Sequence, residues 1–344
     1  SASSKLIHGG LRYLEQYKFR LVREALEERE ILLATAPHIV HPLRFVLPHR
    51  AGMRPPWLIG LGLGLYDRLG GRRTLPGSER VDLTDPDWSG GLTIAAETGF
   101  AYPDCSVDDA RFVVLAAIDA ARNGADILTR TRLTALRRSG EAWACALEEP
   151  AGATGEVSAR VVVNAAGPWA DHVRAATGEA ATRRLRLVKG SHIVVARLHP
   201  CDHAFILSHD DGRVVFVIPY ADRYSLIGTT DVAVEKPDGN AAPSDDEIKY
   251  LCGVVNGYFG SELRSDHVVW GYAGVRALYD DGKADPATVT RDYVLDLDAG
   301  EDGAAPMLTV YGGKITTARR LAERVMKRLD RFFPDLGPPW TATT

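Results

Sequence analysis

The chain has 344 residues, of which 45% are hydrophobic and 25% charged, a balance that excludes a disordered, collagen-like or coiled-coil protein. Its formal net charge is −4, so no overall basic character favours nucleic acid as a partner. The cysteines Cys105, Cys145, Cys201 and Cys252 form no C-x-x-C pair, which argues against a disulfide scaffold or zinc ribbon and fits a reducing compartment.

Two helices and a short apolar segment are predicted in the first third of the chain. Apolar residues recur with a period close to 3.6 over residues 11–36, which predicts one long amphipathic helix that a proline ends. The apolar run 57–66 resembles an apolar helix and is half the ~20 residues that would span a bilayer. A further helix is predicted over 108–123, with Asp104 or Ser106 as its cap.

From residue 125 onward the pattern changes to short strands. Two alternating segments, 127–138 and 141–149, predict a hairpin, and the β-branched run 159–167 predicts a buried parallel strand that ends in a tight turn. Further strand-like runs are 185–198, 203–209, 213–220, 224–232, 268–278, 288–298 and 307–311, and two more helices are predicted over 244–258 and 316–332. The first of these helices opens with the capping box Ser244–Glu247. The sequence thus predicts a mixed α/β protein with a large sheet in its second half.

Three glycine-containing segments are candidate cofactor sites. Gly60-x-Gly62-x-Gly64 lacks the preceding strand and the acidic residue of a dinucleotide fingerprint, so we favour membrane contact or buried packing for it. The turn 164–169 follows a buried strand, and 311–317 joins a strand to a helix N-terminus. The small residues of the first turn let the backbone approach a flat or phosphorylated ligand closely. In the second turn, the N–H groups that the glycines expose and the charge of Lys314 suit a negatively charged ligand. A plain connection between two elements is the alternative for both turns.

His192 and Arg276 interrupt apolar strands. A histidine in such a place is either a hydrogen-bonded core residue or a general base, and both interpretations stay open. The string His199-Pro-Cys201-Asp-His203 contains metal-ligating residue types, but its proline makes it a loop without helical ligand spacing. We therefore expect no metal site there.

Several segments, taken together and in order, resemble one protein family. They are SASSKLIHGGLRYLE, ALEEREILLATAPHIV, LVKGSHIVV, FVIPY, IGTTDV, GVRAL, TRDYVLD and GGKITTARRLAE. These segments are similar to the FAD-dependent glycerol-3-phosphate dehydrogenases of aerobic glycerol metabolism, from residue 1 to about Trp340. In that family a strand, a G-x-G-x-x-G turn and a helix precede the matching region and a helical domain follows it, and neither is found in these 344 residues.

The resemblance implies the fold class α/β (α+β). It implies an FAD/NAD(P)-binding Rossmann-like lobe, incomplete at its N-terminus, beside an antiparallel-sheet substrate domain. Residues 1–41, 92–180 and 306–344 would form the FAD-binding lobe. Residues 42–91 and 181–305 would form the substrate-binding or cap domain.

The resemblance also implies the residues of the site. FAD would be bound by Ser3, Ser4, Lys5, Leu6, Leu133, Ala166, Gly167, Trp169, Gly313, Lys314 and Thr316. Arg12, Tyr13 and Arg276 would hold the substrate, because paired guanidinium groups suit a phosphate. His192 is the favoured general base, since the ordinary pKa of a histidine lies near 6.5, with Lys314 as its rival. Arg276 completes the catalytic set.

The implied reaction is the oxidation of sn-glycerol 3-phosphate to dihydroxyacetone phosphate, with electrons passed from FAD to a quinone. The first 80 residues hold 13 Lys and Arg against 7 Asp and Glu. This basic character and the apolar segment 57–66 favour peripheral association with the inner face of the cytoplasmic membrane. Two alternatives stay open: an oxidase that uses O2, and a truncated fragment that does not retain FAD. The sequence predicts no nucleic-acid partner and leaves a homodimer open.

Overall fold

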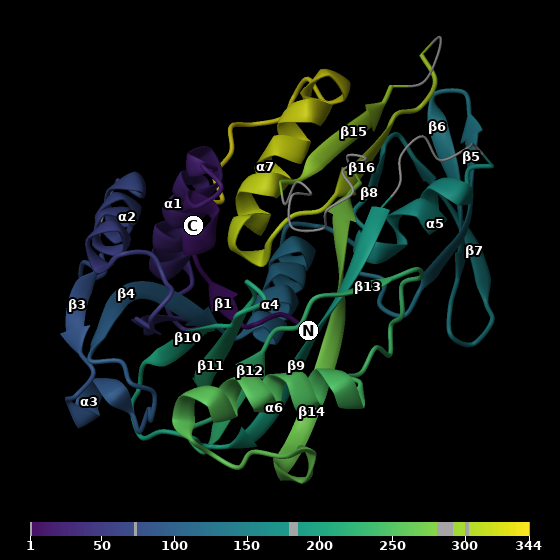
Figure 1. The fold of residues 1–344 in the computed structure, drawn as a ribbon. Coiled ribbons are helices and arrows are strands. Elements are labelled where there is room, and N and C mark those ends of the chain that lie inside the picture. Colours follow the sequence, from purple (N-terminus) through teal and green to yellow (C-terminus); the bar gives the residue numbers. More distant parts are fainter. Residues whose placement is uncertain (1, 72–73, 179–184, 281–291, 300–302, 344) are drawn as a thin grey trace.

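The computed structural model describes residues 2–71, 74–178, 185–280, 292–299 and 303–343, and its strands form three sheets (Figure 1). The strands of the largest sheet are β1 (Leu6–Ile7), β2 (Val40–Pro48), β3 (Glu79–Asp82), β4 (Thr98–Val107), β9 (Leu185–Ala196), β10 (Ala204–Ser208), β11 (Val214–Tyr220), β12 (Tyr224–Gly228), β13 (Val232–Val234) and β14 (Val268–Tyr279). Their order is β1-β4-β2-β10-β11-β12-β9-β13, with β14 paired to β9 and β3 paired to β4.

The helices lie between and after these strands. They are α1 (Phe19–Thr35), α2 (Pro56–Leu69), α3 (Pro86–Ser89), α4 (Asp109–Arg122), α5 (Ala170–Ala175), α6 (Asp245–Phe259) and α7 (Ala318–Leu329). Short 3-10 helices are η1 (Leu11–Leu14), η2 (Gly167–Trp169), η3 (Ser265–His267), η4 (Ile315–Thr317) and η5 (Asp330–Phe332). The predicted mixed α/β fold class is therefore confirmed.

Strand β9 is the hub of the large sheet. It pairs antiparallel with β12, β13 and β14, so that His192 lies opposite Gly228 on one neighbour and opposite Tyr272 on another. Strands β10 and β11 form a hairpin, and β2 joins β10 in parallel. These strands are rich in valine, isoleucine and leucine because much of the sheet is covered on both faces.

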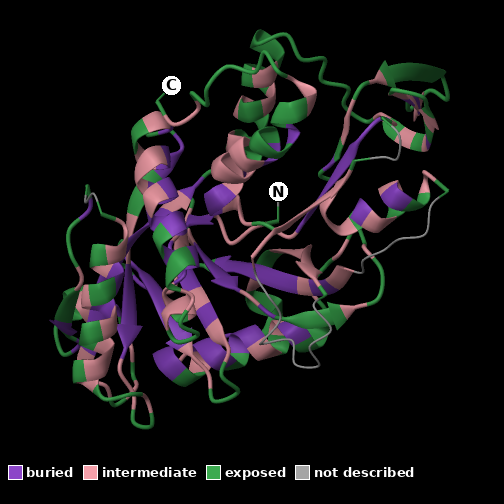
Figure 2. Ribbon diagram, turned by 90° about the horizontal axis from the view of Figure 1, so that it is seen from above, coloured by how far each residue is buried: buried purple, intermediate pink, exposed green. Residues whose placement is uncertain are grey.

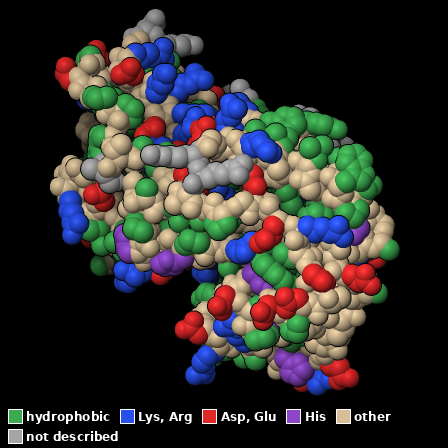
Figure 3. Space-filling model, turned by 90° about the vertical axis from the view of Figure 1, so that its left-hand side faces the viewer, with side chains coloured by type: hydrophobic (Ala, Val, Ile, Leu, Met, Phe, Trp, Pro, Cys, Tyr) green, Lys and Arg blue, Asp and Glu red, His purple; other side chains and the backbone are tan. Residues whose placement is uncertain are grey.

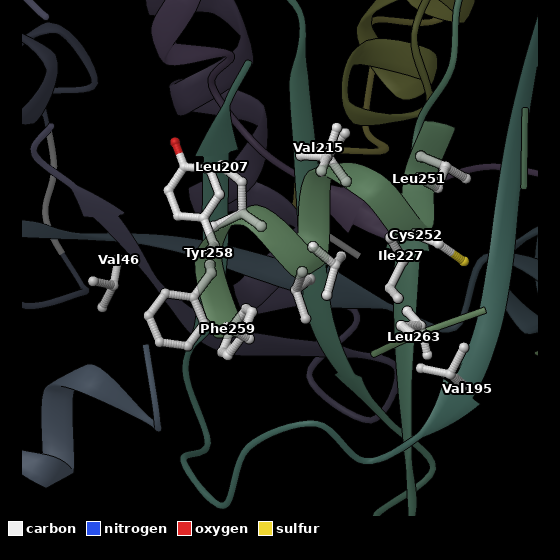
Figure 4. Close-up of a cluster of buried hydrophobic side chains, with 14 of the residues drawn as sticks. Val46, Val195, Leu207, Val215, Ile227, Leu251, Cys252, Tyr258, Phe259 and Leu263 are labelled. Atoms are coloured by element: carbon white, nitrogen blue, oxygen red, sulfur yellow. The ribbon is translucent and has the colours of Figure 1, made fainter. Parts of the chain in front are cut away.

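Helices cover the two faces of the large sheet, and the buried residues concentrate in its strands and in the helix surfaces turned toward them (Figure 2). Helix α6 packs Leu251 against one face, in the buried cluster that also holds Val195 (Figure 4). Helices α1 and α2 cover the other face, where Leu26 belongs to a second cluster that contains Val194. Val194 and Val195 belong to different cores because successive side chains of a strand point to opposite faces.

Two smaller sheets complete the fold. Their strands are β15 (Val294–Asp298), β16 (Met307–Tyr311) and β8 (Val162–Asn164) in one, and β5 (Arg132–Ser139), β6 (Ala142–Glu148) and β7 (Thr154–Ala159) in the other. Strand β16 lies between β15 and β8, antiparallel to the first and parallel to the second. Helix α7 packs Val325 and Leu329 against Leu308 of β16, which fixes the turn between β16 and η4.

Ion pairs join α1 to α7. Both oxygens of the Glu28 carboxylate, which is fully buried, accept hydrogen bonds from Arg319, at 2.9 Å from Nε and 2.6 Å from Nη2. Arg324 donates to Glu24 at 2.7 Å in the same interface. Because burying a charge is costly unless it is paired, this interface holds the two helices in one register.

The predicted helices and strands are found in the predicted order, with corrections at their ends, whereas β1 to β4 and β7 have no counterpart in the prediction. The prediction of one helix over residues 11–36 is wrong. Tyr17 adopts a left-handed φ of 57°, and the turn 15–18 separates η1 from α1. The cap of α4 is Asp108, whose side chain accepts from Arg111 N, and neither Asp104 nor Ser106, because both of those belong to β4. The predicted hairpin, the capping box and the helix over 57–66 are confirmed.

Two predictions about the sheets need correction. Strand β8 is parallel as predicted, but it lies at the edge of its sheet and leaves Val163 43% exposed. The large sheet is not confined to the second half of the chain, since β1 to β4 come from the first 107 residues. The predicted run 288–298 falls partly outside the described residues, and its described part contains β15.

The domain boundaries stay a prediction. Strands β1 and β4 of the predicted FAD lobe lie in one sheet with strands of the predicted substrate domain.

Helix α2 carries an exposed apolar surface. Trp57 is 70% exposed, Leu61 64% and Leu65 40%, and Figure 3 shows hydrophobic side chains gathered on the side of the molecule that carries this helix. The glycines at 60, 62 and 64 lie inside α2, so the rejection of a dinucleotide turn there is confirmed. None of the helices within the described ranges has the length and apolar character needed to cross a membrane.

Candidate functional site

His192 is buried at the centre of the site, with only 2% of its surface exposed. Its Nε2 lies 2.9 Å from Ser4 Oγ, and its ring stacks on Tyr272 with 4.9 Å between centroids and 9° between planes. The ring also lies across Gly228, because a Cβ at that glycine would come within 2.1 Å of His192 Cδ2. These contacts with Ser4, Tyr272 and Gly228 therefore fix the position of the imidazole ring.

The electrostatics of His192 keep its ring neutral. Burial, with the positive charges of Arg276 and Lys5 adding to it and Asp109 opposing it, lowers the pKa of His192 to about 3. Its Nδ1 is buried and has no hydrogen-bond partner among the described residues. A neutral imidazole can accept a proton, but a pKa of about 3 lies well below the ordinary value on which the prediction of a base rested, so the role of His192 stays a prediction.

The segment that carries Ser4 is fastened by Asp109, the first residue of α4. This fully buried carboxylate accepts from Ser3 Oγ and from Lys5 Nζ, both at 2.7 Å. Tyr272 donates to Ser3 O at 2.7 Å. Sequence reasoning missed Asp109 and Tyr272, because an acidic residue in the first turn of a helix is ordinarily explained by the helix dipole.

A glycine turn leads from this segment to the predicted substrate residues. Gly9 N donates to Tyr66 Oη at 3.0 Å and to Asp104 Oδ1 at 3.2 Å. Gly10 has a φ of 73°, and a Cβ there would come within 2.5 Å of the Tyr13 ring. This turn therefore requires glycine and sets the direction of η1.

Tyr13 and Lys314 are brought together. Lys314 Nζ lies 3.8 Å from the centroid of the Tyr13 ring, a cation–π contact between η1 and the turn that follows β16. The same turn contains Gly313, with a φ of 105°, and Thr316, whose Oγ1 accepts from His8 N at 3.2 Å. Burial, with Lys314 adding to it, lowers the pKa of His8 against the charge of Asp104.

Arg12 and Arg276 are held by different partners. Arg12 Nη2 donates to Gly212 O at 2.7 Å, in the turn between β10 and β11. Arg276 is paired with Asp231 and donates to Thr229 Oγ1 at 3.0 Å. Arg276 also lies across Gly190, where a Cβ would come within 2.6 Å of its Nη2. Each guanidinium group thus has its position set by protein contacts.

The remaining predicted FAD residues are spread over three places. Ala166, Gly167 and Trp169 form the turn after β8, where Gly167 has a φ of 55° and nothing lies within 4 Å of the position of a Cβ. Leu6 is buried in the cluster under α1 and α2. Leu133 lies in β5 and packs with Leu136 and Trp143 in the core of the small sheet.

One surface groove lies elsewhere, and none of the predicted site residues lines it. It has a volume of about 630 Å³ and is lined in part by Arg44, Trp88, Cys201 and His203. Within the described ranges, no group of three or more His, Cys, Asp or Glu side chains is arranged to hold a metal ion.

Comparison with known proteins places this geometry in context. Residues 1–335 match the family described as FAD dependent oxidoreductase. The chain is 51% identical over 343 residues to a glycerol-3-phosphate dehydrogenase of Pseudomonas aeruginosa, which covers 99% of this chain and 66% of that protein. It is 51% identical over 344 residues to a D-erythritol 1-phosphate dehydrogenase of Brucella abortus, with 99% and 68% covered. It is 47% identical over 349 residues to an aerobic glycerol-3-phosphate dehydrogenase of Escherichia coli, again with 99% and 68% covered. The chain thus spans about two thirds of the length of these relatives.

Solved structures share the fold. A glycerol-3-phosphate dehydrogenase from Bacillus halodurans complexed with FAD has a TM-score of 0.77 at 23% identity, with 99% of this chain and 59% of that chain covered. An L-α-glycerophosphate oxidase from Mycoplasma pneumoniae with FAD bound has a TM-score of 0.71 at 15% identity, with 100% and 87% covered. These likenesses confirm the fold that the resemblance implied.

Proposed function

Since this chain belongs to the FAD dependent oxidoreductase family, we propose that it oxidises sn-glycerol 3-phosphate to dihydroxyacetone phosphate. FAD is the cofactor of the family, as predicted. The observation that carries the proposal is the buried, neutral His192, which shares a site with the cationic Arg276. The names of the relatives from Pseudomonas aeruginosa and Escherichia coli support the substrate.

The residues of the site fit a flavin. The place beside Gly167 is open, and the Nδ1 of the buried His192 is unpartnered among the described residues. The backbone of Ser3 to Leu6, the turn 166–169 and the turn 313–316 would hold FAD, with Lys314 supplying a positive charge. When bound, FAD supplies the acceptor for the hydride that leaves C2 of the substrate.

The residues of the chain would supply the rest of the chemistry. His192 would take the proton from the C2 hydroxyl, so that loss of a proton and a hydride leaves a ketone. Arg276, with Arg12, would bind the phosphate dianion, because a guanidinium group offers forked donors. The Asp231 carboxylate beside Arg276 fixes the direction of that fork before the substrate arrives. Lys314 stays the rival base.

A second substrate deserves an equal test, because the relative from Brucella abortus is also 51% identical. Its name specifies D-erythritol 1-phosphate, which shares a phosphate group with sn-glycerol 3-phosphate. The site residues described above would recognise a phosphate and a hydroxyl, which both compounds carry. Relative kcat/KM for the two phosphates distinguishes the two functions.

We also propose that electrons pass to a quinone and that the protein associates peripherally with the inner face of the cytoplasmic membrane. The exposed Trp57, Leu61 and Leu65 of α2 support a lipid contact, since an apolar helix face of this kind lies in the interface plane. The alternative acceptor is O2, as in the oxidase from Mycoplasma pneumoniae. Peroxide release in air, compared with the rate of reduction of a soluble quinone, distinguishes the two acceptors.

The first experiment is the visible spectrum of the purified protein, before and after anaerobic addition of each phosphate. We expect flavin bands that bleach with sn-glycerol 3-phosphate in the unchanged protein and persist in His192→Gln. Flavin bands that neither phosphate bleaches would contradict the reaction. A protein without bands after addition of FAD would instead be the truncated, non-catalytic fragment.

A further inference from the structure

Glu247 of α6 binds an unusual number of donors for one carboxylate, and it is 5% exposed. Its Oε1 accepts from Ser191 Oγ at 2.8 Å and from Thr230 Oγ1 at 2.7 Å. Its Oε2 accepts from Ser244 N at 2.9 Å and lies 2.8 Å from Lys189 Nζ. These hydrogen bonds and the lysine outweigh burial and lower the pKa of Glu247 to about 2, so the group is ionised at neutral pH.

The two oxygens serve different parts of the molecule. Oε2 completes the capping box at the start of α6, which is a local role for the helix. Oε1 accepts instead from two hydroxyls outside α6, those of Ser191 in β9 and of Thr230 in the connection between β12 and β13. A residue that only capped α6 would need no bond from Oε1 to Ser191 and Thr230.

The two hydroxyls belong to the segments that set the site. Ser191 precedes His192 in β9, and its N–H donates to Thr230 Oγ1 at 2.9 Å. Thr230 stands between Thr229 and Asp231, the two partners of Arg276. Glu247 therefore ties the residue before His192 to the residue between the partners of Arg276.

Glu247 acts from the opposite face of the sheet. Ile193 and Val195 of β9 lie in the core under α6, whereas Val194 lies in the core of the other face. By the same alternation Ser191 faces α6, and His192 faces the site. The carboxylate is thus separated from the His192 side chain by the sheet itself.

We propose that Glu247 is a positioning residue for the oxidation site, whose Oε1 fixes both the strand that carries His192 and the loop that orients Arg276. The proposal rests on the proposed function for its kinetic consequence. Through Ser191 the carboxylate sets the place of the base, and through Thr230 it sets the direction of the guanidinium fork. Small displacements of reacting groups cost large factors in rate, so these bonds are expected to be visible in turnover.

The test separates the two oxygens of Glu247 by changing their partners. Thr230→Val keeps the shape of the side chain and removes the hydroxyl that donates to Oε1 and accepts from Ser191 N, while Thr230→Ser keeps the hydroxyl. Ser244→Ala removes the capping hydroxyl of α6, which donates to Oε2 at 3.0 Å and makes no contact with Oε1, and is the matched control for helix capping. Ser191→Ala tests the other bond to Oε1.

In the FAD-bound protein we expect Thr230→Val and Ser191→Ala to lower kcat/KM roughly tenfold to a hundredfold. Displacement of His192 should lower kcat, and misdirection of Arg276 should raise KM. Thr230→Ser should stay near the unchanged protein. Ser244→Ala should lower the Tm and leave kcat/KM within about twofold, since an N-cap contributes to helix stability alone.

A second readout does not depend on turnover. The imidazole resonances of His192, assigned by their loss in His192→Gln, should shift in Thr230→Val and Ser191→Ala and stay in place in Ser244→Ala. Unchanged resonances and unchanged kcat/KM in the first two variants would overturn the proposal. If the unchanged protein oxidises neither phosphate while the resonances shift as described, the proposed function fails and the positioning role stands.

Discussion

Ser4 Oγ lies 2.9 Å from His192 Nε2, although the two residues stand 188 positions apart in the chain. The contact joins the segment fastened by Asp109 to the centre of the large sheet. Its donor depends on which nitrogen of His192 carries the proton. A base oriented in this way loses rotational freedom before the substrate arrives, which lowers the entropy cost of reaction.

Ser4→Ala should therefore slow the oxidation without unfolding the protein. Loss of one hydrogen bond, worth about 1 kcal/mol, corresponds to roughly a fivefold to tenfold fall in kcat/KM. Steady-state rates normalised to bound flavin measure this effect apart from loss of FAD. Ser106→Ala is the control, since its hydroxyl makes only a long 3.4 Å contact with His41 O. Equal kcat/KM in both variants would show that Ser4 does not orient His192.

Acid should weaken the fold through the buried histidines. Burial lowers the pKa of His199 to about 4, and the charges of His203 and Arg197 act in the same direction. Between pH 6.5 and 4, His199 takes up a proton in the unfolded chain but stays neutral in the folded protein. The free energy of unfolding therefore falls as the pH falls through this range, by about 1.4 kcal/mol per pH unit for such a histidine.

His199→Phe should remove this contribution. The ring packs on Phe205 and Phe259, so an apolar ring of similar size should be tolerated at pH 7. Urea unfolding at pH 6.5 and 5 should show an acid-induced loss smaller by about 1.6 kcal/mol than in the unchanged protein. Phe259→Leu, in the same stack, should lower stability equally at both pH values. If His199→Phe leaves the pH dependence of the free energy of unfolding unchanged, His199 is not the source of the loss in acid.

Glu28→Gln should destabilise the fold strongly. It removes the charge of a buried carboxylate whose two oxygens both accept from Arg319, and it leaves Glu323 as the remaining carboxylate beside the guanidinium group. The expected loss is about 3 kcal/mol in urea unfolding. Glu156→Gln is the control, because its pair with Arg137 is exposed and should contribute less than about 1 kcal/mol. Similar losses in the two variants would contradict this account.

Replacement of the apolar face of α2 should release the protein from lipid. The double variant Trp57→Ser and Leu61→Ser should lower binding to anionic vesicles at least tenfold, since each large side chain contributes about 1.5–3 kcal/mol on burial. Val113→Ser with Val114→Ser on α4 removes residues that are 60% and 56% exposed and should leave binding unchanged. Co-sedimentation at low salt gives the measurement. If the unchanged protein does not co-sediment with such vesicles, the membrane proposal is wrong.

The sequence predicts most elements of this fold because their signals are local. The capping box of α6 and the β5–β6 hairpin follow from spacing and alternation alone. The break between η1 and α1 does not, since Tyr17 takes a left-handed conformation that no glycine announces. The predicted cap of α4 is wrong because Asp104 lies inside β4, where it is buried and hydrogen-bonded to Tyr66 and Arg29, and no local pattern indicates these contacts.

The candidate site divides in the same way. The resemblance names His192, Lys314 and Arg276 by their motifs, and the structure supplies the contacts that hold them. Asp109 carries no local sign of its contacts with Ser3 and Lys5, because those contacts form only when β1 pairs with β4. Pairing between distant segments is a tertiary property, so the residues that position a site are harder to predict than those in its motifs.

The pairing of β9 with β12 and β14 makes the length of this strand part of the chemistry. A single inserted residue ahead of Ser191 would exchange the sides of every side chain that follows, placing a hydroxyl where the imidazole belongs and turning the imidazole toward α6. A substitution in β9 can lower activity by a small or a large amount, whereas an insertion or deletion turns every following side chain to the other face at once. Among descendants of this chain, changes of length should accumulate in exposed turns such as 150–153 and be absent from β9.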